Sequence, residues 1–235
     1  MRCAILIPAR DEARALPPLF ERLGALPAES RPSSIVVVDN GSTDETAQVA
    51  RRLGARVVEE PRPGYGQACL AGIAALRGAG PPDVVVFLDA DDFAAPAQIG
   101  RLLDPIERGE ADLVVGERVA SPADRGVRWH ARLGNRLVLA LLRWRYGSRV
   151  RDMGPFRAIR WGTLESLALD DRNYGWYVQM QVRALRSGAR VVGTPIEFER
   201  RTVGVSKVSG NPISSAMAGW VMLRTLASEM LSARD

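Results

Sequence analysis

The stretch VVVFLDADDF, residues 84–93, runs from a buried-type strand of apolar residues directly into three aspartates. Unpaired negative charge at the end of a buried strand is costly, so this pattern needs a physical reason. Asp89 and Asp91 occupy alternating positions and can point the same way, which suits one Mg²⁺ or Mn²⁺ ion whose other ligands are phosphate oxygens. The alternative is an acidic helix-capping turn ahead of Pro96.

Similar apolar runs surround this strand in the first half of the chain. Strands are expected at CAILIPA (3–9), SIVVVDN (34–40), ARVVEE (55–60), DVVVFLD (83–89) and ADLVVGE (111–117). Helices are expected over 12–26, 43–53, 66–78 and 96–108, the second capped by Ser42 or Thr43. Alternating strands and helices predict an α/β fold with a mostly parallel sheet flanked by helices on both faces. Ligands of such sheets bind at the carboxyl ends of the strands.

The second half is less regular. Its expected elements are a basic helix over 128–146, a strand at 154–159, helices at 161–168 and 174–187, a strand within 189–201 bent at Pro195, and a last helix at 212–232. The segment between the last strand and the last helix, 202–210, is expected to be a polar loop. Repeats, low-complexity linkers and domain boundaries are not evident, so residues 1–235 are expected to form a single domain.

Charge is divided unevenly along the 235 residues, although the net charge is only +5. Residues 1–117 hold 12 basic and 18 acidic residues, a net of −6, whereas 118–235 hold 20 basic and 9 acidic residues, a net of +11. A basic half can serve nucleic acid, an anionic membrane surface or a phosphorylated substrate, or can be a solvated surface. Lys207 is the one lysine among 32 basic residues, a compact ammonium group in an otherwise arginine-based chain.

The composition also narrows the cellular setting. Apolar residues make up 46% of the chain, but the sequence shows no uncharged apolar stretch long enough to span a membrane, and the N-terminus becomes charged too early for a signal peptide. A cytoplasmic protein is therefore expected. Cys3 and Cys69 lack metal-ligand spacing and are expected to be reduced core thiols.

Polar residues follow three of the expected strands, and a parallel sheet would bring them to one edge. Asp39 is placed to accept hydrogen bonds from a base or ribose, while Gly41 and Ser42 form a tight turn before a helix. The segment PRPGYGQA (61–68), with Gly64, is a glycine-flanked turn suited to close approach by a ligand. Each glycine feature alone resembles an ordinary turn. Only their combination with the polar strand ends indicates a ligand-binding site.

Together these motifs resemble family 2 glycosyltransferases with the GT-A fold, over nearly the whole chain. IPARDEA (7–13), with Pro8, Arg10 and Glu12, resembles the family's opening strand motif, and VVVDNGSTDET (36–46) resembles its second nucleotide-binding strand. FLDADD (87–92) resembles the metal motif that holds a divalent ion on a nucleotide-sugar diphosphate. The resemblance implies that Glu12, Asp39, Gly41 and Gly64 bind the nucleoside, and that Asp89 and Asp91 hold Mg²⁺ or Mn²⁺.

The second half narrows the resemblance to polyprenyl-phosphate sugar synthases. VVGER (114–118), RDMGPFRAIR (151–160) and RRTVGVSKVSG (200–210) resemble their acceptor-side strand, an active-site segment and a basic loop over phosphates. The resemblance implies that Arg118, Arg132, Arg201 and Lys207 bind the donor diphosphate and the acceptor phosphate. It also divides the chain into a nucleotide-sugar half, 1–117, and an acceptor half, 118–235. Asp92 and Phe93 depart from the family pattern after the metal motif, which leaves the sugar and the nucleotide open.

The acceptor determines whether a general base is needed. An alcohol needs a base to remove its proton, whereas a phosphate monoester is already ionised near neutral pH. Many inverting relatives carry that carboxylate on a helix where this chain has Gln179 and Gln181, which favours a phosphate acceptor. Asp152 remains either a base or a residue that orients a neighbouring arginine.

The sequence therefore predicts a metal-dependent, inverting hexosyltransferase. The expected donor is a UDP- or GDP-hexose. The expected acceptor is phosphorylated, and polyprenyl phosphate is the favoured candidate. The alternatives are a small soluble acceptor or a non-catalytic nucleotide-sugar-binding module. The helix at 212–231 either contacts a membrane peripherally or packs on the protein's own core or a second copy as a homodimer. Nucleic acid is not an expected partner.

Overall fold

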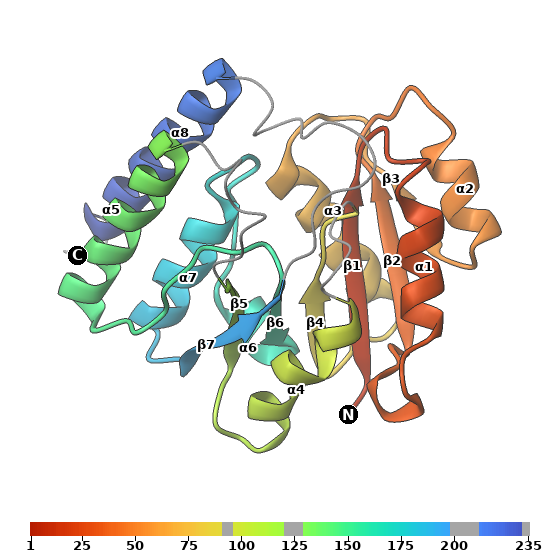
Figure 1. The fold of residues 1–235 in the computed structure, drawn as a ribbon, viewed down its shortest axis with the longest axis horizontal. Coiled ribbons are helices and arrows are strands. Elements are labelled where there is room, and N and C mark those ends of the chain that lie inside the picture. The colour runs from red at the N-terminus through yellow and green to blue at the C-terminus, as the bar shows by residue number, and fades with distance from the viewer. Residues whose placement is uncertain (91–95, 120–128, 198–211, 232–235) are drawn as a thin grey trace.

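The structure, a computed structural model, describes residues 1–90, 96–119, 129–197 and 212–231, and for 129–133 and 212–219 it describes the backbone alone. Its centre is a seven-stranded sheet (Figure 1). The strands are β1 (Cys3–Ala9), β2 (Ser34–Asp39), β3 (Arg56–Glu59), β4 (Val84–Phe87), β5 (Leu113–Arg118), β6 (Arg157–Arg160) and β7 (Val191–Ile196).

The strand order is β3-β2-β1-β4-β6-β5-β7. β1 pairs in parallel with β2 and β4, β2 with β3, and β5 with β7, whereas β6 is antiparallel to both β4 and β5. Four strand pairs are parallel and the two pairs that β6 makes are antiparallel, so the expectation of a mostly parallel sheet is confirmed. Because β6 reverses direction between them, β4 and β5 point the same way.

Helices cover both faces of the sheet. They are α1 (Leu16–Gly24), α2 (Thr46–Arg52), α3 (Tyr65–Ala79), α4 (Ile99–Glu107), α5 (Trp129–Tyr146), α6 (Trp161–Ser166), α7 (Trp176–Arg186) and α8 (Pro212–Leu231), with short 3₁₀ turns η1 (Ala28–Ser30) and η2 (Pro96–Gln98). α1 and α4 pack on one face, and α3 and α7 pack on the other. α5 and α8 lie side by side in an outer layer beyond α7 (Figure 1).

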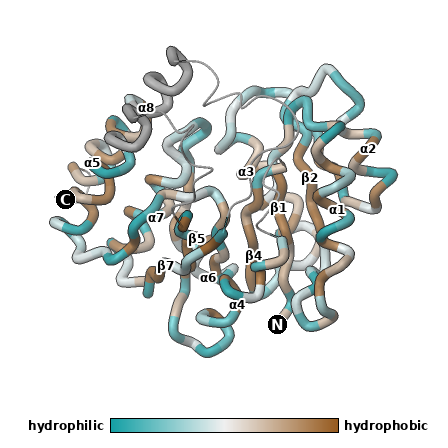
Figure 2. The backbone as a smooth tube through the Cα atoms, in the orientation of Figure 1, coloured by the Kyte–Doolittle hydropathy of each residue, from teal (hydrophilic) through white to brown (hydrophobic). Residues whose placement is uncertain are grey.

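The core follows from the strand sequences. Side chains alternate between the two faces of a strand, so Leu6 joins the α3 side while Ile5 and Ile7 join the α1 side. All three are fully buried, as is expected of strands covered on both faces. Figure 2 shows the resulting hydrophobic centre along β1, β2 and β4. Cys3 and Cys69 are buried free thiols, as expected, and burial raises the pKa of Cys3 to about 12.

Several expected boundaries were wrong, because contacts with other segments shift the ends of the elements. α2 begins at Thr46 with Glu45 as its N-cap residue, not at Ser42 or Thr43, and no side chain caps it. The residues before it form a polar turn, in which Asp44 accepts hydrogen bonds from Thr46. β6 begins at Arg157 and not at 154, because residues 152–156 pack against the end of β5.

Candidate active site

The ends of four strands meet at one edge of the sheet. The register pairs Ala9 of β1 with Asp39 of β2, and the backbone of Leu88 bonds to Leu6, so Asp89 follows at the same level. Arg118 ends β5, which points in the same direction. Acidic groups therefore occupy the β2 and β4 side of this edge, and a guanidinium occupies the β5 side.

Two loops at this edge are tied to one another. The backbone N–H groups of Asp11 and Glu12 donate to the hydroxyls of Ser42 (2.9 Å) and Thr46 (2.8 Å). The Asp11 carboxylate in turn accepts from the Thr43 backbone at 2.7 Å. Asp11 adopts a positive φ of 49°, a conformation that aspartate tolerates better than most residues. This reciprocal bonding makes the ends of β1 and β2 one rigid unit that includes Glu12.

Asp39 is positioned inside the turn that follows it. One of its carboxylate oxygens accepts from the Ser42 backbone at 3.1 Å, and Gly41 between them has a φ of 70°. A Cβ at Gly41 would also lie 3.3 Å from the Pro61 carbonyl, so both conformation and space favour glycine. Pro8 and Arg10 lie on β1 and just after it, at the same edge, with Arg10 exposed.

Asn40 is a positioning residue that the sequence analysis missed. Its buried amide donates to the carbonyls of Glu60 (3.0 Å) and Arg62 (2.7 Å), and its oxygen accepts from the Gly64 backbone at 3.0 Å. The neighbouring Glu60 carboxylate binds the Arg62 guanidinium and the Gln67 amide, and these hydrogen bonds lower the pKa of Glu60 to about 2. Asn40 and Glu60 thus hold the 61–67 turn beside β2. The signal was a second polar residue after the strand, Asn40 beside Asp39.

The glycines of this turn are explained by packing within the chain. Gly64 has a φ of 140°, and a Cβ there would lie 2.2 Å from the Arg172 carbonyl. A Cβ at Gly66 would lie 2.1 Å from the Asp171 carbonyl. The space that was expected to admit a ligand at these glycines is filled by the 170–173 segment.

Asp89 is held by a tyrosine at the start of α3. The Tyr65 hydroxyl donates to one carboxylate oxygen of Asp89 at 2.8 Å, and the same hydroxyl contacts that of Tyr177 on α7. Burial raises the pKa of Tyr177 well above its usual value, so this phenol stays protonated. The metal-motif strand is therefore connected to two helices on one face of the sheet.

This environment fits a hard divalent cation. Carboxylate oxygens are the ligands that Mg²⁺ and Mn²⁺ prefer, and a hydroxyl bonded to a carboxylate is the usual means of orienting it. Asp91, the second expected ligand, lies outside the described residues, as do Asp92 and Phe93. Among the residues that the structure does describe, His, Cys, Asp and Glu side chains form no cluster of three suited to a metal.

Arg118 and Asp152 form a two-pronged ion pair. Arg118 Nε and Nη2 donate to the two carboxylate oxygens at 2.7 and 2.9 Å. Asp152 also accepts from Asn135 on α5 and from the Met153 backbone. Burial would raise the pKa of Asp152, but the bonds and charge of Arg118 hold this pKa below its usual value. Asp152 therefore carries a firmly ionised carboxylate with its oxygens in use, and Arg118 remains 41% exposed at the edge.

Close backbone packing sets the position of this pair. A Cβ at Gly154 would lie 2.4 Å from the Gly116 carbonyl, and one at Gly116 would lie 2.8 Å from the Phe156 carbonyl. The two glycines let the segment that carries Asp152 lie directly against the end of β5. The glycines of VVGER and RDMGPFRAIR thus serve the packing that joins the two motifs.

Arg157 is a buried cation behind the site. Its side chain is inaccessible to solvent, donates to the Gly154 and Tyr177 carbonyls, and lies 4.3 Å from the centre of the Tyr177 ring. Burial lowers its pKa to about 9, while the charges of Asp152 and Asp89 oppose that shift. The family resemblance implied that this arginine belongs to a segment lining the site, whereas its side chain lies inside the core.

Gln179 holds the 170–173 segment in place. Its amide oxygen accepts from the Asp170 and Asp171 backbones at 2.9 Å, and its nitrogen donates to Asp170 and Glu229. The neighbouring Gln181 is fully buried. Gln179 therefore supports the loop that packs on Gly64 and Gly66.

Three other expected phosphate-binding residues cannot be placed. Arg201 and Lys207 lie outside the described residues, and so does the side chain of Arg132.

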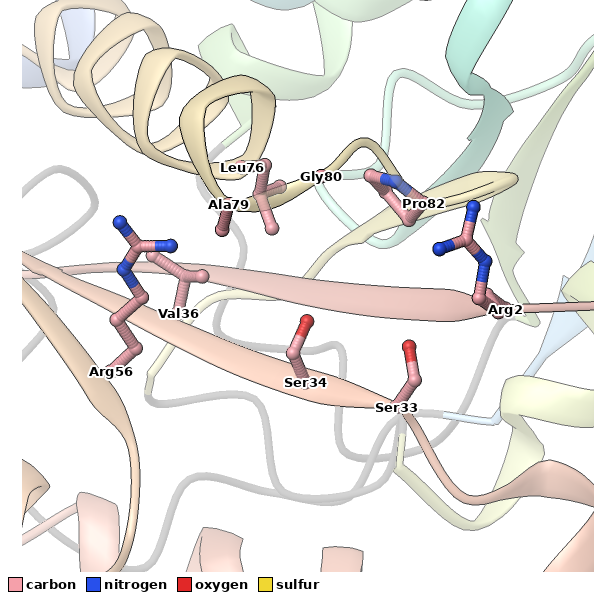
Figure 3. A pocket seen from close by; sticks show the side chains of 9 residues that line it. All are labelled: Arg2, Ser33, Ser34, Val36, Arg56, Leu76, Ala79, Gly80 and Pro82. Atoms are coloured by element: carbon pink, nitrogen blue, oxygen red, sulfur yellow. The ribbon is translucent and has the colours of Figure 1, made fainter.

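A pocket of about 230 Å³ lies at the opposite edge of the sheet (Figure 3). Arg2 and Arg56 stand at its two ends, and Ser33 and Ser34 lie between them. Arg2 is already bonded to the Pro81 carbonyl and the Ser33 hydroxyl to the Cys3 carbonyl. Because these residues lie at the starts of the strands, the pocket is separate from the site at the strand ends.

Comparisons with known proteins decide the family. The model of "Glycosyl transferase family 2" matches residues 4–167, which include the strand ends and the Arg118–Asp152 pair. The chain belongs to this family. Its structure resembles the crystal structure of glucosyl-3-phosphoglycerate synthase from Mycobacterium tuberculosis in complex with Mn²⁺, UDP and glucosyl-3-phosphoglycerate, with a TM-score of 0.76 and 23% identity over 97% of this chain and 79% of that one. That likeness shows the GT-A fold.

Curated relatives of this glycosyltransferase span most of its length. An uncharacterised glycosyltransferase of Mycobacterium tuberculosis is 40% identical over 91% of this chain and 93% of its own. The polyprenol monophosphomannose synthase of Mycolicibacterium smegmatis is 32% identical over 92% of this chain and 84% of its own. The undecaprenyl-phosphate mannosyltransferase of Micrococcus luteus is 33% identical over 92% of this chain and 91% of its own.

Proposed function

We propose that this glycosyltransferase transfers a hexose, with inversion, from a UDP- or GDP-sugar to polyprenyl phosphate, and that the transfer depends on Mg²⁺ or Mn²⁺. One observation carries the proposal. A carboxylate side formed by Asp39 and Asp89 and a cationic side formed by Arg118 share one edge of the sheet. The names of the relatives from Mycolicibacterium smegmatis and Micrococcus luteus support the lipid phosphate acceptor.

In this proposal each half of the site has its own task. Asp39, Glu12 and the Gly41 turn bind the nucleoside, with the Pro8 and Arg10 segment beside them. Gly64 acts by letting the 61–67 turn pack against the 170–173 segment. Asp89 and Asp91 would hold the cation, which would neutralise charge on the leaving diphosphate. Arg118, with Arg201 and Lys207, would bind phosphate oxygens of the donor and the acceptor.

The ion pair supports a phosphate acceptor. An oxygen of an ionised phosphate monoester attacks the anomeric carbon, the bond to the donor diphosphate breaks, and a nucleoside diphosphate leaves, so no proton has to be removed from the acceptor. Asp152 suits this chemistry as a positioning residue, because both of its oxygens bind Arg118. Its lowered pKa makes it a weak base near neutral pH. We therefore assign Asp152 the orientation of Arg118.

The first test is thermal unfolding with UDP-, GDP- and dTDP-sugars, each with and without Mn²⁺. A ligand that binds only the folded state raises the melting temperature, so one nucleotide should give a manganese-dependent shift. That labelled sugar is then offered to polyprenyl phosphate and to soluble phosphorylated acceptors. A labelled lipid product is expected. Transfer only to a soluble acceptor would show that the acceptor is not a lipid. The absence of any nucleotide-dependent shift in melting temperature would overturn the donor assignment.

A further inference from the structure

We propose that the outer face of α5 and α8 docks on an anionic lipid surface through exposed tryptophans and unpaired arginines. The inference rests on the proposed lipid acceptor for its biological meaning, but its evidence is separate from the donor site. None of the helices that the structure describes is long and apolar enough to cross a membrane.

Exposed hydrophobic side chains are concentrated on these two helices. Among the described residues seven large hydrophobic side chains are exposed, and four of them lie on α5 and α8. They are Leu137 (46% exposed), Trp144 (77%), Trp220 (67%) and Leu231 (63%). A single exposed leucine is ordinary at a protein surface, but two leucines together with two tryptophans on adjacent helices form a group that needs an explanation. Tryptophan favours membrane interfaces, because its ring is apolar and its N–H is polar.

Arginines lie among these hydrophobic residues. On α5, Arg136 and Arg143 are seven residues apart and so share the exposed face with Leu137 and Trp144. On α8, Arg224 lies four residues after Trp220 and is also exposed. Each helix therefore presents a mixed basic and apolar stripe, the composition of helices that lie on anionic membranes.

The arginines of this face have few acidic neighbours among the described residues. Residues 129–151 contain six arginines and no acid, and the one acid of α8, Glu229, is buried against Arg183. Among the described residues, the side chains of Arg136, Arg143 and Arg224 form no ion pair, whereas Arg51, Arg77 and Arg190 elsewhere each bind a carboxylate. Anionic headgroups supply the missing negative charge.

The same stripe fits other partners less well. In a symmetric pair of chains, each stripe would face its own copy and bring like charges together without an acid to offset them. RNA would use the arginines and tryptophans, but it has no use for exposed Leu137 and Leu231. A lipid interface accounts for the leucines, the tryptophans and the arginines together.

α5 also connects this face to the site. Asn135, in the first half of this helix, donates to Asp152 at 3.0 Å. Trp144 lies nine residues further, or about 14 Å along the helix axis at 1.5 Å per residue. A bilayer against α5 would therefore lie within reach of the phosphate-binding arginine that Asp152 orients.

The test measures binding of the full chain to vesicles that contain no polyprenyl phosphate. Binding to phosphatidylcholine vesicles should be weak, and added phosphatidylglycerol should strengthen it in a manner that high salt reverses. Replacing Arg136 and Arg143 together by glutamine should lower the affinity by about 25-fold, from about fivefold per basic residue. Trp144→Ser with Trp220→Ser should lower binding at all salt concentrations.

The matched control is Arg52→Gln with Arg101→Gln, which removes the same charge from α2 and α4. It should retain binding; an equal loss would show that net charge alone is responsible and would overturn the proposal. Equal binding to both vesicle types, or preferential binding of single-stranded RNA that the α5 variants lose, would also overturn it. The nucleotide-dependent melting shift should persist in every variant, so a failed donor site and a failed docking face give different results.

Discussion

At the scale of single residues, the carboxylates of the site differ in how firmly they are held. Asp152 is enclosed by Arg118, Asn135 and a backbone N–H, whereas Asp89 is oriented by the Tyr65 hydroxyl. The first arrangement fixes the position of Arg118, and the second fixes the carboxylate that would hold the cation in the proposed site. These two tasks lead to different predictions.

Asp152→Asn should raise KM for the phosphate acceptor about tenfold with a smaller change in kcat, because Arg118 loses its partner but no base is lost. Arg118→Gln with Asp152→Asn should be little worse than Arg118→Gln, since both changes remove one interaction. Steady-state kinetics over a range of pH checks this. The Asp152 pKa lies below its usual value, so activity should show no titration of this group near neutral pH. A fall in kcat of more than about a hundredfold with loss of a pH limb would identify a base instead.

Tyr65→Phe removes the hydroxyl that orients Asp89 and leaves the ring contact with Tyr177 in place. Loss of such a supporting hydrogen bond should weaken the binding of Mn²⁺ by about 10-fold or more. Titration of Mn²⁺ in the presence of the nucleoside diphosphate measures this. The control is Tyr146→Phe on α5, whose buried hydroxyl has no hydrogen-bond partner in the described structure. Equal effects from both variants would remove Tyr65 from the site.

At the scale of elements, the second half of the site depends on how α7, α8 and the 152–156 segment are fastened. Glu229 of α8 is buried and binds Arg183 and Arg186 of α7. Gly154 allows the 152–156 segment to lie against β5. Ion pairs thus hold α8 on α7, whereas close packing at Gly154 holds the 152–156 segment on β5.

Glu229→Gln should lower the free energy of unfolding by about 2 kcal/mol, because a charged hydrogen-bonded partner of Arg183 is lost in a largely buried position. Urea unfolding with an unchanged m-value checks this. Glu165→Gln, which breaks the exposed pair with Arg77, should cost no more than about 0.5 kcal/mol. Equal costs for the two substitutions would show that α8 is not fastened at Glu229.

Gly154→Ala should displace the segment that carries Asp152, since the new Cβ would meet the Gly116 carbonyl at 2.4 Å. Acceptor binding should fall and the melting temperature should drop. Gly78→Ala in α3 is the control, because a Cβ there meets nothing within 4 Å. It should stabilise the helix by about 0.5–1 kcal/mol. A Gly154→Ala variant with normal melting and kinetics would contradict the packing argument.

At the scale of the whole molecule, acid stability should depend on Glu60. The pKa of this carboxyl falls from 4.5 to about 2 in the folded protein, so its contribution is complete above pH 4.5 and is lost as the pH falls towards 2. Glu60→Gln should therefore lower stability at neutral pH and flatten its dependence on pH between those values. Thermal unfolding across this pH range measures both effects. An unchanged pH dependence would show that Glu60 keeps its ordinary pKa.

Sequence reasoning predicted the strands well and the loops poorly. Buried strands such as VVVF can be recognised in the sequence by their continuous apolar residues, because both faces of the sheet are covered. The start of α2 was misplaced because Ser42 and Thr43 bond to Asp11 in the loop after β1, which local propensity cannot reveal.

The site was predictable as a set of strand ends, but its supporting contacts were not. Asn40, Tyr65 and Arg157 act through residues far away in the sequence. The roles of Asp91, Arg201 and Lys207, the single domain and its division at 117 and 118 stay predictions. The antiparallel direction of β6 was also not predicted, since a four-residue strand carries no sign of its direction.

The reversed strand has a consequence for how the two halves of the enzyme hold together. In the described sheet β6 is the one strand that joins β3-β2-β1-β4 to β5-β7. This strand is only four residues long, and it is synthesised after both of the strands that flank it. The strands β3-β2-β1-β4 are therefore all synthesised before β6, whereas β5 and β7 join them in the sheet only once β6 is present. Under mechanical load or heat, we expect the sheet to separate at β6 into the strands β3-β2-β1-β4 and the pair β5-β7.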